Sequence, residues 1–329
     1  MAPVKKHLLV GICFVLALDI CAQHHSLDLT GGDKASLVGE GWISTNRYER
    51  DFAISPDGKE IFYTLQMPQN SFQTILYTRK NAAGKWSDPV VASFAGHYSD
   101  LEPAFSNDGL QLFFVSNRPL TGTEKKDFDI WVVNKTGSGW GEAKNLGAPV
   151  NSPVNEFYPS VAASGNIYFT AEYPNASGKE DIFMCRWNGS SFGNPEKLDS
   201  AINSLAYEFN AYVSPNEQYI IFSSFGRKDE KGGGDLYLSK KDQHGNWQPA
   251  QNIQLLNSVK LDYCPFLSPD KKTLYFTSEQ HAMQKTYEKK PVSYAELVDV
   301  SNSALNGSGN IYKINFEVVL RSLTGFQHE

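Results

Sequence analysis

A pattern of about fifty residues recurs five times along this chain and constrains its fold more than any other feature. Each copy contains a tight turn, and the turns start at Ser55, Ser106, Ala162, Ser214 and Ser268, at intervals of 51, 56, 52 and 54 residues. The first turn reads Ser-Pro-Asp-Gly, in which Asp tolerates turn geometry and Gly supplies a positive φ. A fixed period of this length predicts a solenoid, a propeller or another array.

Each copy also supplies patterns for four short strands. In the second copy the apolar segments 102–105, 112–115 and 129–133 are the first three strands. A fourth strand is expected around a Trp or Phe that follows a Gly/Asn turn, at 85–89, 139–143, 191–195 and 246–249. Four consecutive strands per repeat are typical of one propeller blade.

The fifth copy has no fourth strand, whereas residues 34–45 align with the fourth-strand segments. We therefore predict an all-β, five-bladed propeller of four-stranded antiparallel blades, in which an N-terminal strand closes the last blade and removes an exposed edge. Six blades is the alternative, if the long insertion at about 278–309 hides a degenerate blade.

The chain begins with the pattern of an export signal. Lys5 and Lys6 precede an apolar segment, and Ile20-Cys21-Ala22 is a plausible cleavage site. We therefore predict a signal peptide at 1–22, a flexible lead at 23–33 and a single propeller domain at 34–329. The expected location is the periplasm, the cell surface or the medium. Lipidation of Cys21 is the weaker alternative, because Asp19 and Ile20 replace the small residues of a lipobox.

Composition excludes several classes of function. A formal charge of −6 argues against nucleic acid as a partner, and the apolar leader is too short to predict a transmembrane span. Cys185 and Cys264 fall in different repeats, which predicts two buried thiols rather than a disulfide. No metalloprotease, serine-hydrolase or phosphate-loop motif is present, and the scattered histidines define no metal site.

The repeats resemble those of a known family. Ser-Pro-Asp-Gly, an aromatic second strand, Gly-Gly-Asp-Leu-Tyr at 233–237 and Trp-x-x-Pro are similar to the TolB-type, WD40-like propeller repeat. The form is that of secreted bacterial propellers and of those that precede OmpA-family domains. The third copy departs from the pattern, since Ala-Ala-Ser-Gly replaces its turn. The resemblance covers about residues 35–320 and implies a binding platform more often than an enzyme, although related propellers include carbohydrate-active enzymes.

One acidic position is present in all five copies, six residues before the turn. Its members are Glu49, Asp100, Glu156, Glu208 and Asp262. A feature that repeats with the fold usually serves the fold, so we expect these carboxylates to accept bonds from backbone N–H groups or from an arginine of the next blade. The alternative is a ring of oxygen ligands for a structural Ca²⁺ at one mouth of the channel.

A variable position lies four residues before the turn. It is occupied by Asp51, Glu102, Tyr158, Asn210 and Cys264, and such asymmetry is what a particular ligand would require. Arg118 and Arg227 each follow a second strand, and they could bridge blades through carboxylates or face an anionic ligand. We take Asp51, Glu102, Tyr158, Asn210, Arg118 and Arg227 as candidate ligand-binding residues at the channel mouth.

The long insertion adds a further functional hint. Its segment 292–300 could form a helical turn or two that caps the channel. The sequence therefore predicts an exported, non-catalytic propeller that binds a protein, a peptide or a glycan of the envelope or exterior at its loop-rich mouth. The alternative is a carbohydrate-active enzyme, a glycoside hydrolase or lyase, that uses channel carboxylates such as Asp51 and Glu102.

Overall fold

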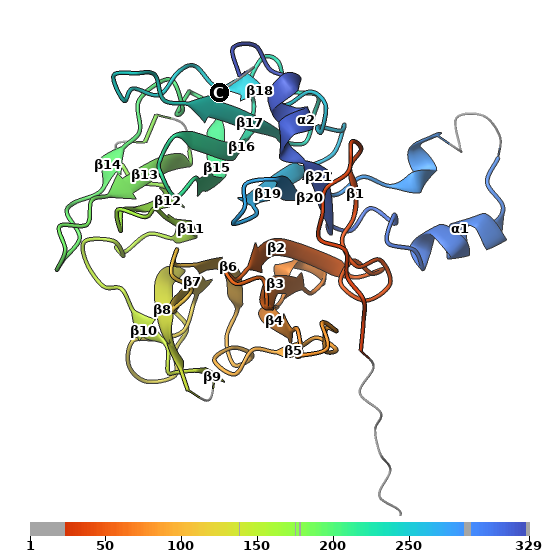
Figure 1. Cartoon of the computed structure of the whole chain (residues 1–329), viewed down its shortest axis with the longest axis horizontal. Helices are drawn as coiled ribbons and strands as arrows, with labels where there is room; N and C mark the ends of the chain where they lie inside the picture. The colour runs from red at the N-terminus through yellow and green to blue at the C-terminus, as the bar shows by residue number, and fades with distance from the viewer. Residues whose placement is uncertain (1–23, 138, 175, 178, 286–290, 327–329) are drawn as a thin grey trace, which may run out of the picture.

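Five antiparallel sheets surround a central axis in the computed structural model, with the innermost strand of each sheet beside the axis (Figure 1). The structure describes residues 24–285 and 291–326, apart from Ser138, Asn175 and Gly178. The all-β, five-bladed propeller is therefore confirmed. The predicted signal peptide at 1–22, with Cys21, lies outside the described residues.

The strands of each blade follow one another from the axis outward. The innermost strands are β2 (Tyr48–Ile54), β6 (Asp100–Phe105), β11 (Glu156–Val161), β15 (Tyr207–Val213) and β19 (Asp262–Leu267). The second strands are β3 (Glu60–Gln66), β7 (Gln111–Ser116), β12 (Ile167–Ala171), β16 (Tyr219–Phe225) and β20 (Thr273–Ser278). Both sets are rich in buried apolar residues, as expected for strands covered on two faces.

The outer half of each blade contains a longer third strand and a very short fourth one. The third strands are β4 (Gln73–Arg79), β8 (Asp129–Thr136), β13 (Asp181–Cys185), β17 (Asp235–Lys240) and β21 (Asn310–Asn315). The outermost strands are β5 (Val90–Val91), β10 (Lys144–Asn145), β14 (Glu196–Lys197), β18 (Gln251–Asn252) and β1 (Ser36–Leu37). A two-residue strand, β9 (Gly139–Trp140), also pairs with β8.

The outermost strands begin a few residues later than the sequence predicts. The predicted segments centre on Trp86, Trp140, Phe192 and Trp247, and three of these residues make only isolated bridges. Pro89, Pro195 and Pro249 follow the aromatic residues closely. Because proline has no N–H to donate, the regular ladder starts only after it.

The N-terminal strand closes the ring as predicted. Ser36 pairs with Lys313 and Leu37 with Tyr312, so β1 is the outermost strand of the blade that contains β21. The N–H of the buried Val38 then donates to the Ile311 carbonyl at 2.9 Å. The first and last strands of the propeller therefore complete the same sheet.

The lead that the sequence predicts to be flexible is packed from residue 24 onward. His25 exchanges backbone hydrogen bonds with Trp86 and stacks on Trp42 at 4.3 Å, while Leu27 and Leu29 pack near Trp86. Apolar residues alternate in this segment, so one side of it can cover the seam between the first and last blades.

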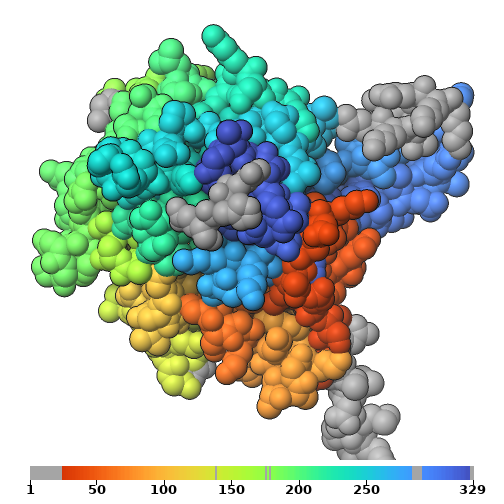
Figure 2. All heavy atoms as spheres, turned by 45° about the horizontal axis from the view of Figure 1, so that its top comes forward, coloured from red at the N-terminus to blue at the C-terminus, as the bar shows by residue number. Residues whose placement is uncertain are grey.

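The insertion contains no sixth blade among its described residues. It consists of the short 3₁₀ segment η2 (Ala282–Lys285) and the helix α1 (Tyr294–Ser301), and a His281–Asn306 bridge closes its base. A helical segment at 292–300 was predicted, but the predicted position over the channel is wrong. It stands away from the ring instead of capping the channel (Figures 1 and 2). Tyr294, Leu297 and Val298 are accordingly exposed, and α1 buries no residue.

A second helix, α2 (Phe316–Arg321), follows β21 directly and was not predicted. It buries Phe316 and Val319 against the last two blades. Cys185 and Cys264 are free and buried. Within the described ranges, neither helix is long and apolar enough to span a bilayer.

The closing strand leads to a first prediction. Val38→Pro removes the donor to the Ile311 carbonyl together with a fully buried side chain, so we expect a loss of about 2–4 kcal/mol of unfolding free energy. Urea denaturation would measure the loss. Leu110→Ala, at a position that is 57% exposed, is the control and should change stability by less than about 0.5 kcal/mol. Wild-type stability of Val38→Pro would show that this contact does not hold the ring closed.

Candidate functional site

The innermost strand of every blade contains a register shift of the β-bulge type. In each blade the same bulge residue has a positive φ of 50–60°, although none of the five is glycine. These residues are the variable position of the repeats: Asp51, Glu102, Tyr158, Asn210 and Cys264. A left-handed residue costs about 1–2 kcal/mol. The fold therefore imposes a strained backbone at five places around its axis.

The bulges bring these five side chains together in a buried cluster, which we call the channel plug, around the guanidinium of Arg50. Arg50 Nε donates to Asp51 Oδ1 and Nη2 donates to Glu102 Oε1, both at 2.8 Å. Its Nη2 also approaches the Cys264 sulfur at 3.6 Å, and the ring of Tyr263 lies 5.0 Å from the guanidinium carbon. One cation from the first blade therefore contacts side chains from three blades.

The remaining members complete the plug. The backbone N–H of Tyr158 donates to Glu102 Oε2 at 2.7 Å, and Asn210 donates to Glu102 Oε1 at 3.4 Å. The Tyr158 hydroxyl crosses to the Pro265 carbonyl at 3.0 Å. Asp51 and Glu102 are only 2% and 4% exposed. The asymmetry of the variable position is thus matched by asymmetric contacts within the protein itself.

Arg50 was missed from the sequence. It occupies the position five residues before the turn, where the other copies have Leu101, Phe157, Phe209 and Tyr263. A lone cation among apolar residues at a repeated position was the available signal. Burial is the largest influence on Glu102 and, although Arg50 opposes it, raises the pKa of that carboxyl to about 8.

Each acid of the repeated ring anchors the loop that leads into its strand. Every one accepts the backbone N–H of the residue four positions earlier, at 2.5–3.2 Å; the donors are Thr45, Gly96, Ser152, Ser204 and Ser258. All five acids are buried. Within the described residues there is no group of three or more His, Cys, Asp or Glu side chains that could hold a metal ion.

Blades are joined at this position by the backbone. The N–H groups of Glu49, Glu156, Glu208 and Asp262 donate to carbonyls of the preceding blade, at Gly309, Phe128, Glu180 and Gly234. Side chain and backbone of one residue therefore fix both the loop and the neighbouring blade.

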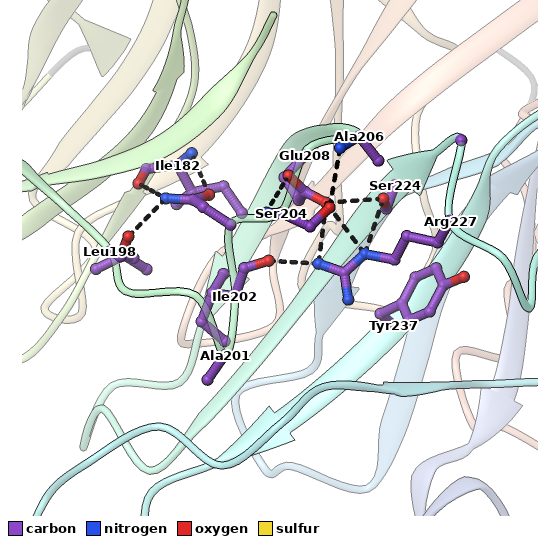
Figure 3. Close-up of polar contacts among 12 residues, drawn as sticks. Ile182, Leu198, Ala201, Ile202, Ser204, Ala206, Glu208, Ser224, Arg227 and Tyr237 are labelled. Carbon is purple, nitrogen blue, oxygen red and sulfur yellow. Dashed lines mark hydrogen bonds and ion pairs between the residues drawn. The ribbon is translucent and has the colours of Figure 1, made fainter. Parts of the chain in front are cut away.

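Arg118 and Arg227 lie inside their blades, away from both cavities described below. Arg227 pairs with Glu208 at 2.9 Å, stacks on Tyr237 and donates to the Ile202 carbonyl (Figure 3). Arg118 repeats the arrangement with Asp100 at 2.6 Å and the Phe94 carbonyl. Each arginine bonds the acid of its own blade, whereas the sequence favoured a carboxylate bridge between blades.

Two cavities border the plug, which contributes Glu102 and Tyr158 to one and Arg50 to the other. The turn-side cavity, of about 280 Å³, is lined by residues from all five innermost strands, including Pro103, Pro159, Pro265, Phe266, Glu102 and Tyr158. The mouth cavity, of about 760 Å³, lies where the loops after the second strands open, between the first and last blades. Its lining includes Arg47, Tyr48, Arg50, Gln66, Tyr263 and Glu279.

The structure therefore divides the predicted site residues into three groups. Asp51, Glu102, Tyr158 and Asn210 meet in the plug, beneath the mouth rather than on it. Of these, Glu102 and Tyr158 also line the turn-side cavity. Arg118 and Arg227 support their own blades. The lining of the mouth cavity comes from two blades: from the first blade at the start of β2, the end of β3 and the following loop, and from the last blade at Leu261, Tyr263, Glu279 and Ser308. The loops at 66–73 and 278–309 were expected at this mouth, but none of the candidate site residues named from the sequence lines the cavity.

Comparison with known proteins gives likenesses of fold. No protein-family model and no curated protein sequence matches the chain. The solved structure of TolB from Acinetobacter baumannii is 13% identical with a TM-score of 0.47, and the match covers 71% of this chain and 49% of TolB. The chain thus spans about half the length of that structure.

Two α-L-arabinofuranosidases are also similar. The enzyme from Lactobacillus brevis is 10% identical with a TM-score of 0.45, covering 83% of this chain and 92% of the enzyme. The enzyme from Podospora anserina is 11% identical with a TM-score of 0.44, covering 87% and 95%. At these identities the likeness says nothing about activity. The association with OmpA-family domains stays a prediction.

The channel plug gives a second prediction. Arg50→Met leaves Asp51 and Glu102 buried without their cation, so we expect a loss of about 3–5 kcal/mol of unfolding free energy, part of which Arg50→Met/Glu102→Gln should restore. Urea denaturation would measure both variants. Arg186→Met removes an exposed ion pair with Glu196 and should cost less than about 1 kcal/mol. Equal losses at Arg50 and Arg186 would contradict the central role of the plug.

The acidic ring gives a third prediction. Burial raises the pKa of Glu156 to about 7, although Ser152 opposes the shift. The folded chain then binds this proton more tightly than the unfolded chain, so the stabilisation is complete at about pH 4 and is lost as the pH rises through 7. We expect the melting temperature to fall between pH 5 and pH 8.

Glu156→Gln should remove part of this dependence, on the order of 1–3 kcal/mol. Differential scanning calorimetry at several pH values would measure it, with the exposed Glu142→Gln as the control. A pH profile that is unchanged by Glu156→Gln would show that this carboxyl does not titrate as the structure indicates.

Proposed function

We propose that this protein is an exported, non-catalytic propeller scaffold that binds a protein, a peptide or a glycan at its loop-rich mouth. The observation that carries the proposal is the contrast between the two parts of the site. The mouth cavity is open and lined by hydrogen-bonding side chains, whereas the channel carboxylates are already bound to Arg50.

The contacts of the carboxylates weigh against the enzyme alternative. A glycosidase places two carboxyl groups about 5–10 Å apart with the scissile bond between them. Here the guanidinium of Arg50 occupies the space between Asp51 and Glu102, bonded to both. A sugar could reach that position only by displacing a buried cation that three blades hold. The raised pKa of Glu102 is the one property that a general acid would share.

Export is part of the same proposal. Lys5, Lys6 and the apolar residues that follow support a cleaved leader, which would place the propeller in the periplasm, on the cell surface or outside the cell. The partner is accordingly expected among envelope or extracellular proteins and glycans. Cleavage between Ala22 and Gln23 would leave the packed segment from residue 24 intact.

Binding and turnover can be tested together, which is our fourth prediction. The purified protein would be screened on a glycan array and against a peptide library, and the same glycans would be assayed for reducing ends or unsaturated products. We expect saturable binding without turnover. Gln69→Ala, on the exposed rim of the mouth cavity, should weaken it severalfold, whereas Glu142→Gln, at an exposed position outside the cavity lining, should not.

Two results would contradict the proposal. Reproducible turnover that is abolished by Asp51→Asn or Glu102→Gln would identify an enzyme. If neither the glycan screen nor the peptide screen detects binding, the proposed binding function of the mouth cavity is wrong. Thermal unfolding of each variant would separate loss of binding from loss of fold.

A further inference from the structure

Arginine side chains line the mouth cavity of this acidic protein. Its lining contains two arginines, Arg47 and Arg50, and a single acid, Glu279. The formal charge of the complete sequence is −6. Asp51 and Glu102 compensate the charge of Arg50, so Arg47 is the cation at the rim that favours an anionic group in the ligand.

Arg50 has one guanidinium nitrogen available to this cavity. Its Nε and Nη2 are engaged in the plug, whereas Nη1 makes only a 3.5 Å contact with Oε1 of Gln66, which itself lines the cavity. The plug holds the guanidinium rigidly from below. The side-chain entropy of Arg50 is therefore already lost on folding, so a ligand that binds this donor does not have to order it.

Arg47 is the second cation and lies at the rim. It is exposed, and its guanidinium makes a single long hydrogen bond, to the Thr45 hydroxyl at 3.4 Å. Among the described residues it has no salt bridge within 4.0 Å. Arg47 therefore offers a guanidinium that no salt bridge occupies to a ligand in the cavity that Arg50 also lines.

Neutral hydrogen-bonding groups surround the two arginines. Gln69 and Asn70 lie in the loop η1 (Pro68–Asn70), and both have left-handed backbones, with φ values of 58° and 53°. Two consecutive left-handed residues that are not glycine are strained, and such strain is often kept where a loop positions side chains for a ligand. Both side chains are exposed at the rim, and their carboxamides can donate to and accept from hydroxyl groups.

Two tyrosines form the aromatic wall. The hydroxyls of Tyr48 and Tyr263 are 2.9 Å apart, and the Tyr48 hydroxyl also donates to Glu279. Glu279 therefore has a donor from within the protein. Burial, followed by the charge of Glu279, raises the pKa of Tyr48, so this phenol stays protonated and polar at neutral pH.

We infer that the mouth cavity binds an acidic oligosaccharide, with a uronate carboxylate at Arg47 and Nη1 of Arg50 and sugar hydroxyls at the carboxamides of Gln66, Gln69 and Asn70. This inference rests on the proposed function and narrows it to one ligand class. Most of the lining residues have polar side chains, and apolar surface from the two tyrosines, Leu65 and Leu261 lies between them, a mixture that suits the hydroxyls and the C–H faces of sugar rings.

Calorimetric titration of the full-length mature protein tests the inference, which is our fifth prediction. The probes are tetramers of three uronates, namely galacturonate, the hyaluronan backbone and alginate, each beside its methyl ester. We expect at least one acid to bind about tenfold or more tightly than its ester, with an affinity that falls between 50 and 500 mM NaCl. A peptide with a free C-terminal carboxylate and its amide form the rival arm.

Two substitutions in the cavity lining should change the affinity for the acid in opposite directions. Arg47→Gln should weaken binding of the acid about tenfold and leave the ester unchanged, because a charged hydrogen bond is lost. Glu279→Gln removes the only acid of the lining but keeps an acceptor for Tyr48, so it should strengthen binding severalfold. Arg321→Gln is the matched control, since Arg321 is exposed on α2 and pairs with Glu317. Arg50 is not varied, because its loss would disrupt the plug.

The outcomes separate this inference from the proposed function. Equal binding of acid and ester, or preference for the peptide carboxylate, overturns the acidic saccharide but leaves a binding mouth. Failure of all three uronates to bind at millimolar concentration also overturns it. Turnover of a uronate probe that depends on Asp51 or Glu102 would overturn the proposed scaffold function as well. Acid binding that Arg47→Gln weakens and Glu279→Gln strengthens supports both.

Discussion

The contact between Arg50 and two buried carboxylates is the interaction around which this propeller is assembled. Five strands converge on one axis, and the bulge in each strand turns one side chain toward that axis. Apolar side chains at all five positions would form an ordinary core. This chain instead has an acid in each of the first two blades, and burying two carboxylates without a cation would cost several kcal/mol. Arg50 supplies the cation from within the same layer, and its guanidinium also lines the mouth cavity.

Uniform and variable positions of the repeat have different physical roles. The acid six residues before the turn is uniform because it meets the same requirement in every blade, a backbone N–H in the loop that enters the strand. The position four residues before the turn is variable because its five side chains meet one another. A single arginine needs acids on some sides and neutral groups on others. Variation at a repeated position therefore does not by itself indicate an external ligand.

The sequence predicted the features that depend on local pattern. Turn chemistry and apolar segments located the blades, and alignment of 34–45 with the outer strands located the closing strand. The contact partners of Asp51 and Glu102 could not be predicted, because they depend on how five strands meet in space. The two-residue outer strands were predicted a few residues too early. Trp86, Phe192 and Trp247 make only isolated β-bridges, and the regular pairing of the outer strand begins after them. The rim residues Gln69 and Asn70 show no signal until their backbone strain is seen.

The pairing of β1 with β21 has a consequence for the order of folding. The two strands are separated by nearly the whole domain, so the N-terminal strand has no partner until the last blade has been made. The first four blades can form from strands that are consecutive in the sequence. The last blade needs a contact between two strands at opposite ends of the domain, and such a contact forms slowly because closing a long loop costs entropy. The ring therefore cannot be complete before the whole domain has been synthesised, and the loss of either end of the chain would leave the last blade with an open edge.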